Sequence, residues 1–152
     1  MVKAKIENET VNAAIKLRVR FDYRGAAKPK GLFFGGKSVE QVAEEVRENK
    51  VALLRNVPFQ GIHIEHIDTS SQPYLVVEEP GGAQAAYAPV LVTIRAEVIE
   101  DIIRFIMREE FRKVEVLEPE VIELSKQDIE RFLFRVSEEM RHYRSSYERR
   151  SD

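Results

Sequence analysis

Nine consecutive residues alternate without exception between apolar and charged side chains. The apolar positions are Ile15, Leu17, Val19, Phe21 and Tyr23, and lysine, arginine and aspartate lie between them. Because successive side chains of a strand point to opposite faces, the alternation predicts a strand with one face in a core and the other in water. This is the clearest strand in the sequence, and the rest of the fold is predicted around it.

Apolar periodicity and turn residues divide the remainder of the chain. Strands are predicted at 61–68, 74–78, 90–96 and 113–119, and a slip in the alternation after Ile64 is typical of a bulge. Helices are predicted from Ser38 toward Pro58, over 97–110, and from Ser125 to at least Tyr143. Residues 79–89 are predicted to form a turn or loop, and the opening residues to add an edge strand.

The order β-α-β-β-β-α-β-α predicts an α+β fold. It favours a ferredoxin-like β-α-β-β-β-α-β sandwich with helices on one face of a mainly antiparallel sheet, plus a C-terminal helix. Residues 1–124 are expected to form a single domain. Residues 125–152 are expected to form an amphipathic helix that packs on this domain, on a partner subunit, or on both.

Composition narrows the functional classes. The chain of 152 residues has no cysteine, which excludes disulfides, cysteine-ligated metals and thiol catalysis and fits a reducing, cytoplasmic setting. No apolar run reaches the roughly 18 residues that a membrane helix needs, and the first residues do not resemble a signal peptide. No catalytic grouping is readable, so the expectation leans away from an enzyme, and no cofactor is expected.

The stretch GLFFGGKS, Gly31 to Ser38, matches the phosphate-loop pattern G-x-x-x-x-G-K-[ST]. A nucleotide- or anion-binding enzyme that uses this stretch is therefore one alternative, with Gly36, Lys37 and Ser38 as the anion-binding residues. The required context is weak, because the apolar strand ends at Tyr23, well before the loop. The simpler interpretation is a glycine turn followed by a capping box, in which Ser38 is the N-cap and Gln41 its partner.

Basic residues form the second candidate site. Lys16, Arg18 and Arg20 share the polar face of the first strand, and the C-terminus is rich in arginine, so nucleic-acid binding is a further, less favoured alternative. RNA-binding sheets also need exposed aromatic rings, and Phe21 and Tyr23 lie on the opposite face by parity. Cross-strand ion pairs with Glu65, Glu115 or Glu118 are the favoured interpretation.

Two histidines, His63 and His66, lie in one predicted strand. A strand can bring them to one face only if it contains a bulge, and zinc needs three or four convergent ligands. No metal site is therefore predicted.

The last helix carries a heptad seam, by which we mean Ile129, Leu133, Val136, Met140, Tyr143 and Tyr147, spaced alternately by four and three residues. Phe132 and Phe134 widen its apolar surface. One interpretation is that the helix packs on its own sheet, or that Ile129 to Val136 do so while the later residues meet a partner. The favoured one is self-association, with Phe132, Val136, Met140, Tyr143 and Tyr147 as interaction residues.

Residues 90–143 resemble the C-terminal extension of WYL-domain transcriptional regulators. The matching pieces are Leu91–Arg95, Phe105, the stretch VEVLEP at 114–119 and Tyr143. No helix-turn-helix precedes them, and the first half has no WYL core motif. The resemblance implies a stand-alone sensing or assembly module and carries no catalytic residue. The sequence as a whole predicts a small, homo-oligomeric binding or assembly module whose small-molecule ligand, if any, it does not identify.

Overall fold

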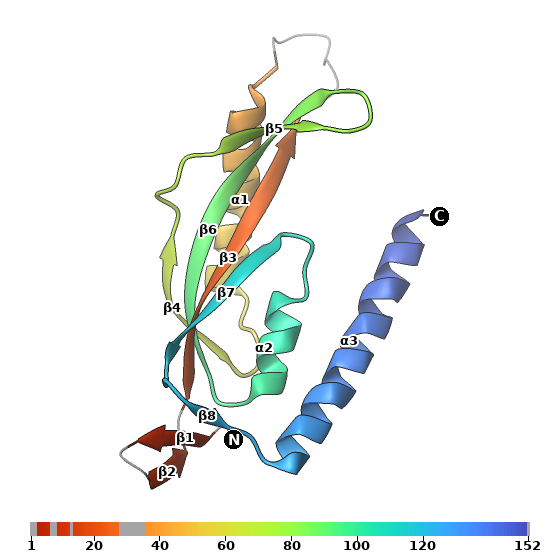
Figure 1. The fold of residues 1–152 in the computed structure, drawn as a ribbon. Helices are drawn as coiled ribbons and strands as arrows, with labels where there is room; N and C mark the ends of the chain where they lie inside the picture. The colour runs from red at the N-terminus through yellow and green to blue at the C-terminus, as the bar shows by residue number, and fades with distance from the viewer. Residues whose placement is uncertain (1–2, 7–8, 13, 28–35, 152) are drawn as a thin grey trace.

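The computed structural model describes residues 3–6, 9–12, 14–27 and 36–151 (Figure 1). An antiparallel five-stranded sheet has the order β4–β6–β3–β7, and β5 pairs with another part of β6. Its strands are β3 (Ile15–Ala26), β4 (Ile62–Asp68), β5 (Tyr74–Glu78), β6 (Ala83–Ala96) and β7 (Phe111–Glu118). The helices are α1 (Val39–Asn56), α2 (Ile99–Ile106) and α3 (Lys126–Ser151). The predicted α+β class, with a mainly antiparallel sheet, is confirmed.

The strand predicted from the alternation lies at the centre of the sheet. β3 pairs with β6 over its whole length, from Ile15 opposite Ala96 to Ala26 opposite Ala85, and with β7 on its other side. Its five apolar side chains are buried in one core with residues of α1 and α2, among them Val51, Leu54, Ile102 and Phe105. α1 and α2 therefore cover the same face of β3, and the charged side chains lie on the other face.

β3 runs three residues farther than the alternation predicts, because α1 crosses its end at very short range. A Cβ atom on Gly25 would lie 2.2 Å from the backbone nitrogen of Ala43 in α1. Only glycine leaves room for this approach, so Gly25 continues the strand instead of ending it. Ala43 packs here against Ala86 and Ala88 of β6, a second cluster built from small side chains.

The prediction of a loop over 79–89 is wrong in its second part. A turn occupies 79–82, but β6 begins at Ala83 and includes Pro89. Pro89 lies between the segment of β6 that pairs with β5 and the segment that pairs with β4. A proline is tolerated in a strand where no neighbour needs its missing N–H. Its carbonyl accepts a hydrogen bond from Arg47 Nη1 of α1 at 3.2 Å.

The opening residues do not extend the main sheet as an edge strand. β1 (Lys3–Ile6) pairs with β2 (Glu9–Asn12) and with β8 (Ile122–Glu123) in a separate three-stranded sheet. α2 also differs from its prediction, since it ends at Ile106 and not at residue 110. The residues after it form the turn that leads into β7.

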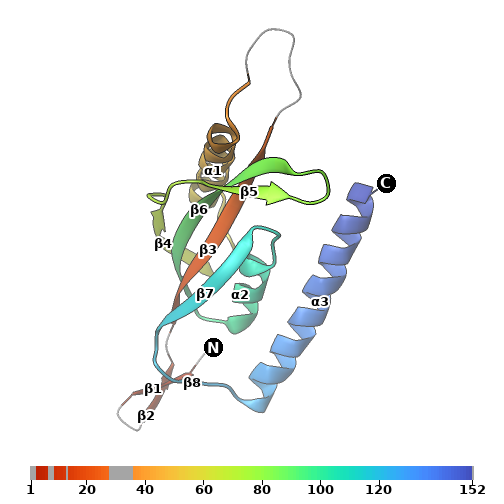
Figure 2. The same ribbon diagram turned by 45° about the horizontal axis from the view of Figure 1, so that its top comes forward.

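α3 stands beside α2 as a long rod in both views of the molecule (Figures 1 and 2). Its principal contact is with α2. The interpretation that this helix packs on the sheet of its own chain is therefore wrong, because α2 lies between them. Among the described residues, no helix is long and apolar enough to cross a membrane.

Candidate functional site

α3 begins with a reciprocal cap. The Ser125 backbone N–H donates to Asp128 Oδ2 at 2.9 Å, and the Asp128 backbone N–H donates to Ser125 Oγ at 3.1 Å. These hydrogen bonds, together with the nearby Arg131, lower the pKa of Asp128 below its usual value. The predicted cap at Ser125 thus sets where α3 starts.

Two ion pairs link α3 to α2. Arg104 Nε of α2 donates to Glu139 Oε1 at 3.0 Å, and Arg131 Nε lies 3.5 Å from Glu100 Oε1. Glu139 also lies 3.9 Å from Arg135 Nη1, within α3 itself. In both pairs between the helices the arginine side chain is exposed, whereas the carboxylates of Glu100 and Glu139 are largely buried. These ion pairs fix how α3 lies against α2, and they do not involve the apolar side chains of α3.

The heptad seam is mostly left in solvent. Ile129, Leu133, Met140, Tyr143 and Tyr147 are each 40–60% exposed. Val136 and Phe132 are half-buried, whereas Phe134 is exposed on another side of the helix. Ile129 and Leu133 are exposed and Val136 is half-buried, so the alternative that the first half of the seam packs inward fails at the first two positions. Among the predicted interaction residues, Met140, Tyr143 and Tyr147 are the accessible ones.

The edge strand nearest α3 adds further exposed apolar side chains. Val114 and Val116 of β7 lie opposite Val19 and Leu17 of β3, on the face that α1 and α2 cover farther in. Both valines nevertheless stay exposed. A contiguous patch of exposed apolar side chains commonly marks an interaction surface.

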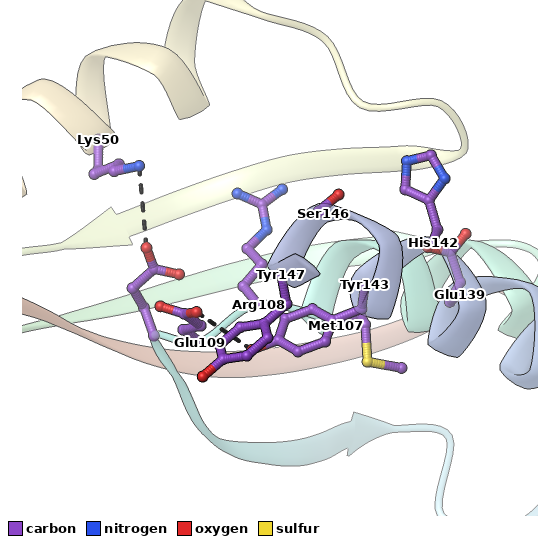
Figure 3. Close-up of a pocket in the computed structure, with 10 residues that line it drawn as sticks. Lys50, Met107, Arg108, Glu109, Glu139, His142, Tyr143, Ser146 and Tyr147 are labelled. Atoms are coloured by element: carbon purple, nitrogen blue, oxygen red, sulfur yellow. Dashed lines mark hydrogen bonds and ion pairs between the residues drawn. The ribbon is translucent and has the colours of Figure 1, made fainter. Parts of the chain in front are cut away.

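A pocket of about 290 Å³ lies where the C-terminal half of α3 passes the turn between α2 and β7 (Figure 3). Its wall combines Lys50 of α1, residues 107–110 of the turn, and side chains of α3 from Glu139 to Tyr147. Two of its carboxylates have partners in the pocket: Glu109 accepts from the Tyr143 hydroxyl at 3.4 Å, and Glu110 Oε1 lies 4.0 Å from Lys50 Nζ.

Arg108 is the least usual side chain of this pocket. Its guanidinium carbon lies 4.7 Å from the ring centre of Phe59, 5.4 Å from that of Phe105 and 5.8 Å from that of Phe21. Its Nε donates to the Phe105 carbonyl at 2.9 Å. Burial lowers the pKa of Arg108, because desolvation disfavours the charged form.

The open face of the sheet carries the basic residues that suggested nucleic-acid binding. Arg18 Nη2 donates to Glu115 Oε2 at 2.8 Å, and Lys16 Nζ lies 3.5 Å from Glu65 Oε2. The predicted cross-strand ion pairs are therefore confirmed. They neutralise much of the positive charge that a phosphate backbone would meet.

Asp22 organises the other end of this face. Its carboxylate is buried and accepts from Arg20 Nε at 2.8 Å, Arg20 Nη2 at 3.0 Å and the Tyr74 hydroxyl at 2.5 Å. The Tyr74 ring stacks on Tyr87 at 5.6 Å between ring centres, and Arg112 lies 5.5 Å from the centre of the Tyr87 ring. The sheet thus brings two aromatic rings to the basic face, although β3 itself supplies none.

The predicted anion-binding residues are placed only in part. Ser38 caps α1, with Gln41 N–H donating to Ser38 Oγ at 3.2 Å and Ser38 N–H to Gln41 Oε1 at 3.0 Å, so the capping box is confirmed. Lys37 pairs with Glu45 in α1, and Gly36 has open space around it. Residues 31–35 lie outside the described part of the chain, and anion binding at Gly36, Lys37 and Ser38 stays a prediction.

The histidine strand contains the predicted bulge. The register of β4 against β6 shifts between Ile64 and His66, which brings His63 and His66 to the same face of the sheet. Within the described residues, no group of three or more histidine and acidic side chains could hold a metal ion.

Sequence reasoning missed three residues of interest. Arg108 follows a helix in a run of charged residues and looks like a solvated position, and only its contacts with Phe21, Phe59 and Phe105 set it apart. Tyr87 was missed because it lies in a predicted loop. Tyr74 lies in a predicted strand, but its place on the basic face follows from its pairing with Tyr87. Recognising 83–89 as a strand, from its alanines around one tyrosine, could have found Tyr87.

No protein-family model, curated protein or solved structure matches this chain. The resemblance of residues 90–143 to the extension of WYL-domain regulators stays a prediction. Its pieces fall on β6, α2, β7 and α3 in succession.

Proposed function

We propose that this protein is an assembly module that associates with a second copy of itself through the heptad seam of α3. The observation that carries the proposal is the exposure of that seam on a helix that is joined to its own chain by ion pairs to α2. The seam spans 19 residues, roughly 27 Å at 1.5 Å per residue.

A second copy fits this surface because the seam is self-complementary. Alternating spacings of four and three residues let one helix place its apolar side chains between those of an identical helix. In an antiparallel pairing centred near Glu138, Val136 meets Met140 of the second copy. By the same spacing, Leu133 meets Tyr143 and Ile129 meets Tyr147. Glu130 then lies near Arg144 of the second copy, an attractive pairing of opposite charges beside the seam.

Light scattering coupled to size-exclusion chromatography tests the proposal. At about 50 µM the wild-type chain should elute as an oligomer, as expected for a dissociation constant of about 1 µM. Replacing Met140→Glu and Tyr143→Glu together should give a monomer, because it places two charges in an apolar interface. Ser145→Glu is the matched control, since it adds a charge on the side of α3 opposite the seam. A monomeric wild type at this concentration would contradict the proposal.

Charge exchange tests the orientation separately. Glu130→Arg and Arg144→Glu should each weaken an antiparallel pair, and the two together should restore it. If both single variants remain as oligomeric as the wild type, the antiparallel pairing is wrong, although association through the seam can still hold.

We further infer that the connectivity is of the ferredoxin-like type. Two features support this: the sheet order β4–β6–β3–β7, and the connection of β3 to β4 by α1 and of β6 to β7 by α2. β5 is an addition to that scheme. A solved structure with a different strand order would contradict the inference.

Nucleic-acid binding at the open sheet face is the second candidate. The stacked Tyr74 and Tyr87 favour it, because they supply the aromatic rings that single-stranded RNA requires. The ion pairs of Arg18 and Lys16 weigh against it. Retention of labelled RNA at about 50 mM salt, lost in Arg18→Glu, would favour this function, and absence of retention would eliminate it.

A further inference from the structure

We propose that the pocket beside Arg108 binds a small organic monocarboxylate. The main donors of this site, Arg108 and Lys50, lie outside α3, although Tyr143 and Tyr147 belong both to the wall of the pocket and to the seam proposed for self-association.

Arg108 carries a charge that the chain compensates only in part, through the negative charge of the nearby Glu110. Within the described part of the chain, no carboxylate forms an ion pair with it, and its Nε is used on a carbonyl oxygen. Burial already disfavours its charged form. A half-buried guanidinium without a carboxylate partner is a ready binding site for one, since the two form charge-assisted, bidentate hydrogen bonds.

The guanidinium is also held in place before any ligand arrives. The rings of Phe59, Phe105 and Phe21 lie within 6 Å of it, a range in which an aromatic ring attracts a cation. The terminal nitrogens point into the space between Lys50 and Ser146 (Figure 3). A preorganised donor loses little conformational entropy on binding.

The surroundings favour a monocarboxylate over phosphate. Lys50 and the Ser146 hydroxyl can add donors to an oxyanion at Arg108. Glu109, Glu110 and Glu139 also line the pocket, and their carboxylates repel a dianion more strongly than a monoanion. The rings of Tyr143 and Tyr147 and the side chain of Met107 offer apolar contacts to the rest of the ligand. The volume of about 290 Å³ is close to that of the smallest ligand pockets, about 300 Å³.

Nuclear magnetic resonance titration tests the site with defined probes. Sodium acetate, butyrate and benzoate are added in turn to the full chain, with sodium chloride at equal ionic strength as the reference. We expect saturable shifts of the backbone amides of Arg108, Glu109 and Ser146, with a dissociation constant of about 1 mM for the best probe. If none of the three probes gives saturable shifts at these amides, the proposal is overturned.

Variants locate the binding. Arg108→Gln should weaken binding at least about tenfold, because it removes a charged hydrogen-bonding partner. Lys50→Gln, at a partly exposed position of α1, should weaken it about threefold and keeps the test valid if Arg108→Gln does not fold. Arg55→Gln, which removes a positive charge from the last turn of α1, is the control and should bind as the wild type does. Equal affinity in Lys50→Gln and the wild type would overturn the assigned site.

Two further experiments distinguish carboxylate binding from phosphate binding and from the proposed self-association. Sodium phosphate that shifts the same amides at lower concentrations than the carboxylates would overturn the choice of ligand class. Leu133→Glu, a seam substitution outside the pocket, should leave carboxylate affinity unchanged even where it produces a monomer. Loss of binding in that variant would overturn a site built within one chain, whereas a monomeric wild type that binds carboxylate would leave this proposal standing without the proposed assembly.

Discussion

α1 and α3 are both amphipathic helices that start at a serine cap, yet their apolar faces meet different surroundings. Val42, Ala43, Val51 and Leu54 of α1 are buried against the sheet. The corresponding stripe of α3 stays largely exposed, because its ionic face is the one that meets α2. An amphipathic stripe therefore indicates that a helix packs against some partner surface. It does not indicate whether that surface belongs to the same chain.

Two leucines give the most direct way to break this comparison. Leu54 of α1 is 4% exposed and Leu133 of α3 is 60% exposed. Leu54→Ala should lower the free energy of unfolding by about 2–5 kcal/mol, because it opens a cavity in the core. Leu133→Ala should change it by no more than about 0.5 kcal/mol in dilute protein. Urea denaturation followed by circular dichroism measures both.

Leu133→Ala has a second expected effect, which is measured at high protein concentration. If the seam joins two copies, Leu133→Ala should also raise the dissociation constant while leaving the unfolding of the monomer unchanged. A loss of several kcal/mol in dilute Leu133→Ala would instead place this side chain in the core of its own chain.

The same contrast explains which parts of the fold the sequence could predict. β3 was predictable because the alternation of five apolar residues reports burial on one face directly, and all five are buried. The end of β3 was not, since Gly25 signals a turn in the sequence and only the approach of Ala43 shows why it continues the strand. The start of β6 was missed for a related reason: alanines and Pro89 have low strand propensity, and the clusters with α1 and β3 override it.

Tyr23 offers a pH-dependent test of the core that α1 helps to close. Burial raises the pKa of Tyr23 from 10.0 to about 12. Below pH 10 the phenol keeps its proton in both folded and unfolded chains, so stability does not depend on it there. Between pH 10 and 12 the unfolded chain releases this proton first, and stability should fall by about 2 kcal/mol. Tyr23→Phe removes the phenol and should reduce that fall.

Urea denaturation at about pH 9 and about pH 11.5 measures the difference for the wild type and for Tyr23→Phe. Other groups also titrate in this range, so the informative quantity is the change in the difference between the two proteins. Equal alkaline losses in both would show that Tyr23 does not carry the effect.

Some residues of the candidate sites could likewise be predicted from the sequence, and others could not. The seam could be predicted, because heptad spacing is a property of one helix, but its exposure could not, because that depends on how α3 meets α2. Arg108 could not be predicted at all. Its importance arises from Phe21, Phe59 and Phe105, which belong to three separate segments and meet only in the folded chain.

The two serine caps provide the smallest and most selective test of the comparison. Ser38→Ala should lower the free energy of unfolding by about 1 kcal/mol, because it removes a cap from a helix that folds as part of the core. Ser125→Ala removes the same kind of cap from α3. If α3 is held to the core mainly by ion pairs, its first turns should open locally, with faster hydrogen exchange and a smaller change in global unfolding. Equal losses of global stability in the two variants would show that α3 unfolds together with the core, which would weaken the case for a helix kept available to a second copy.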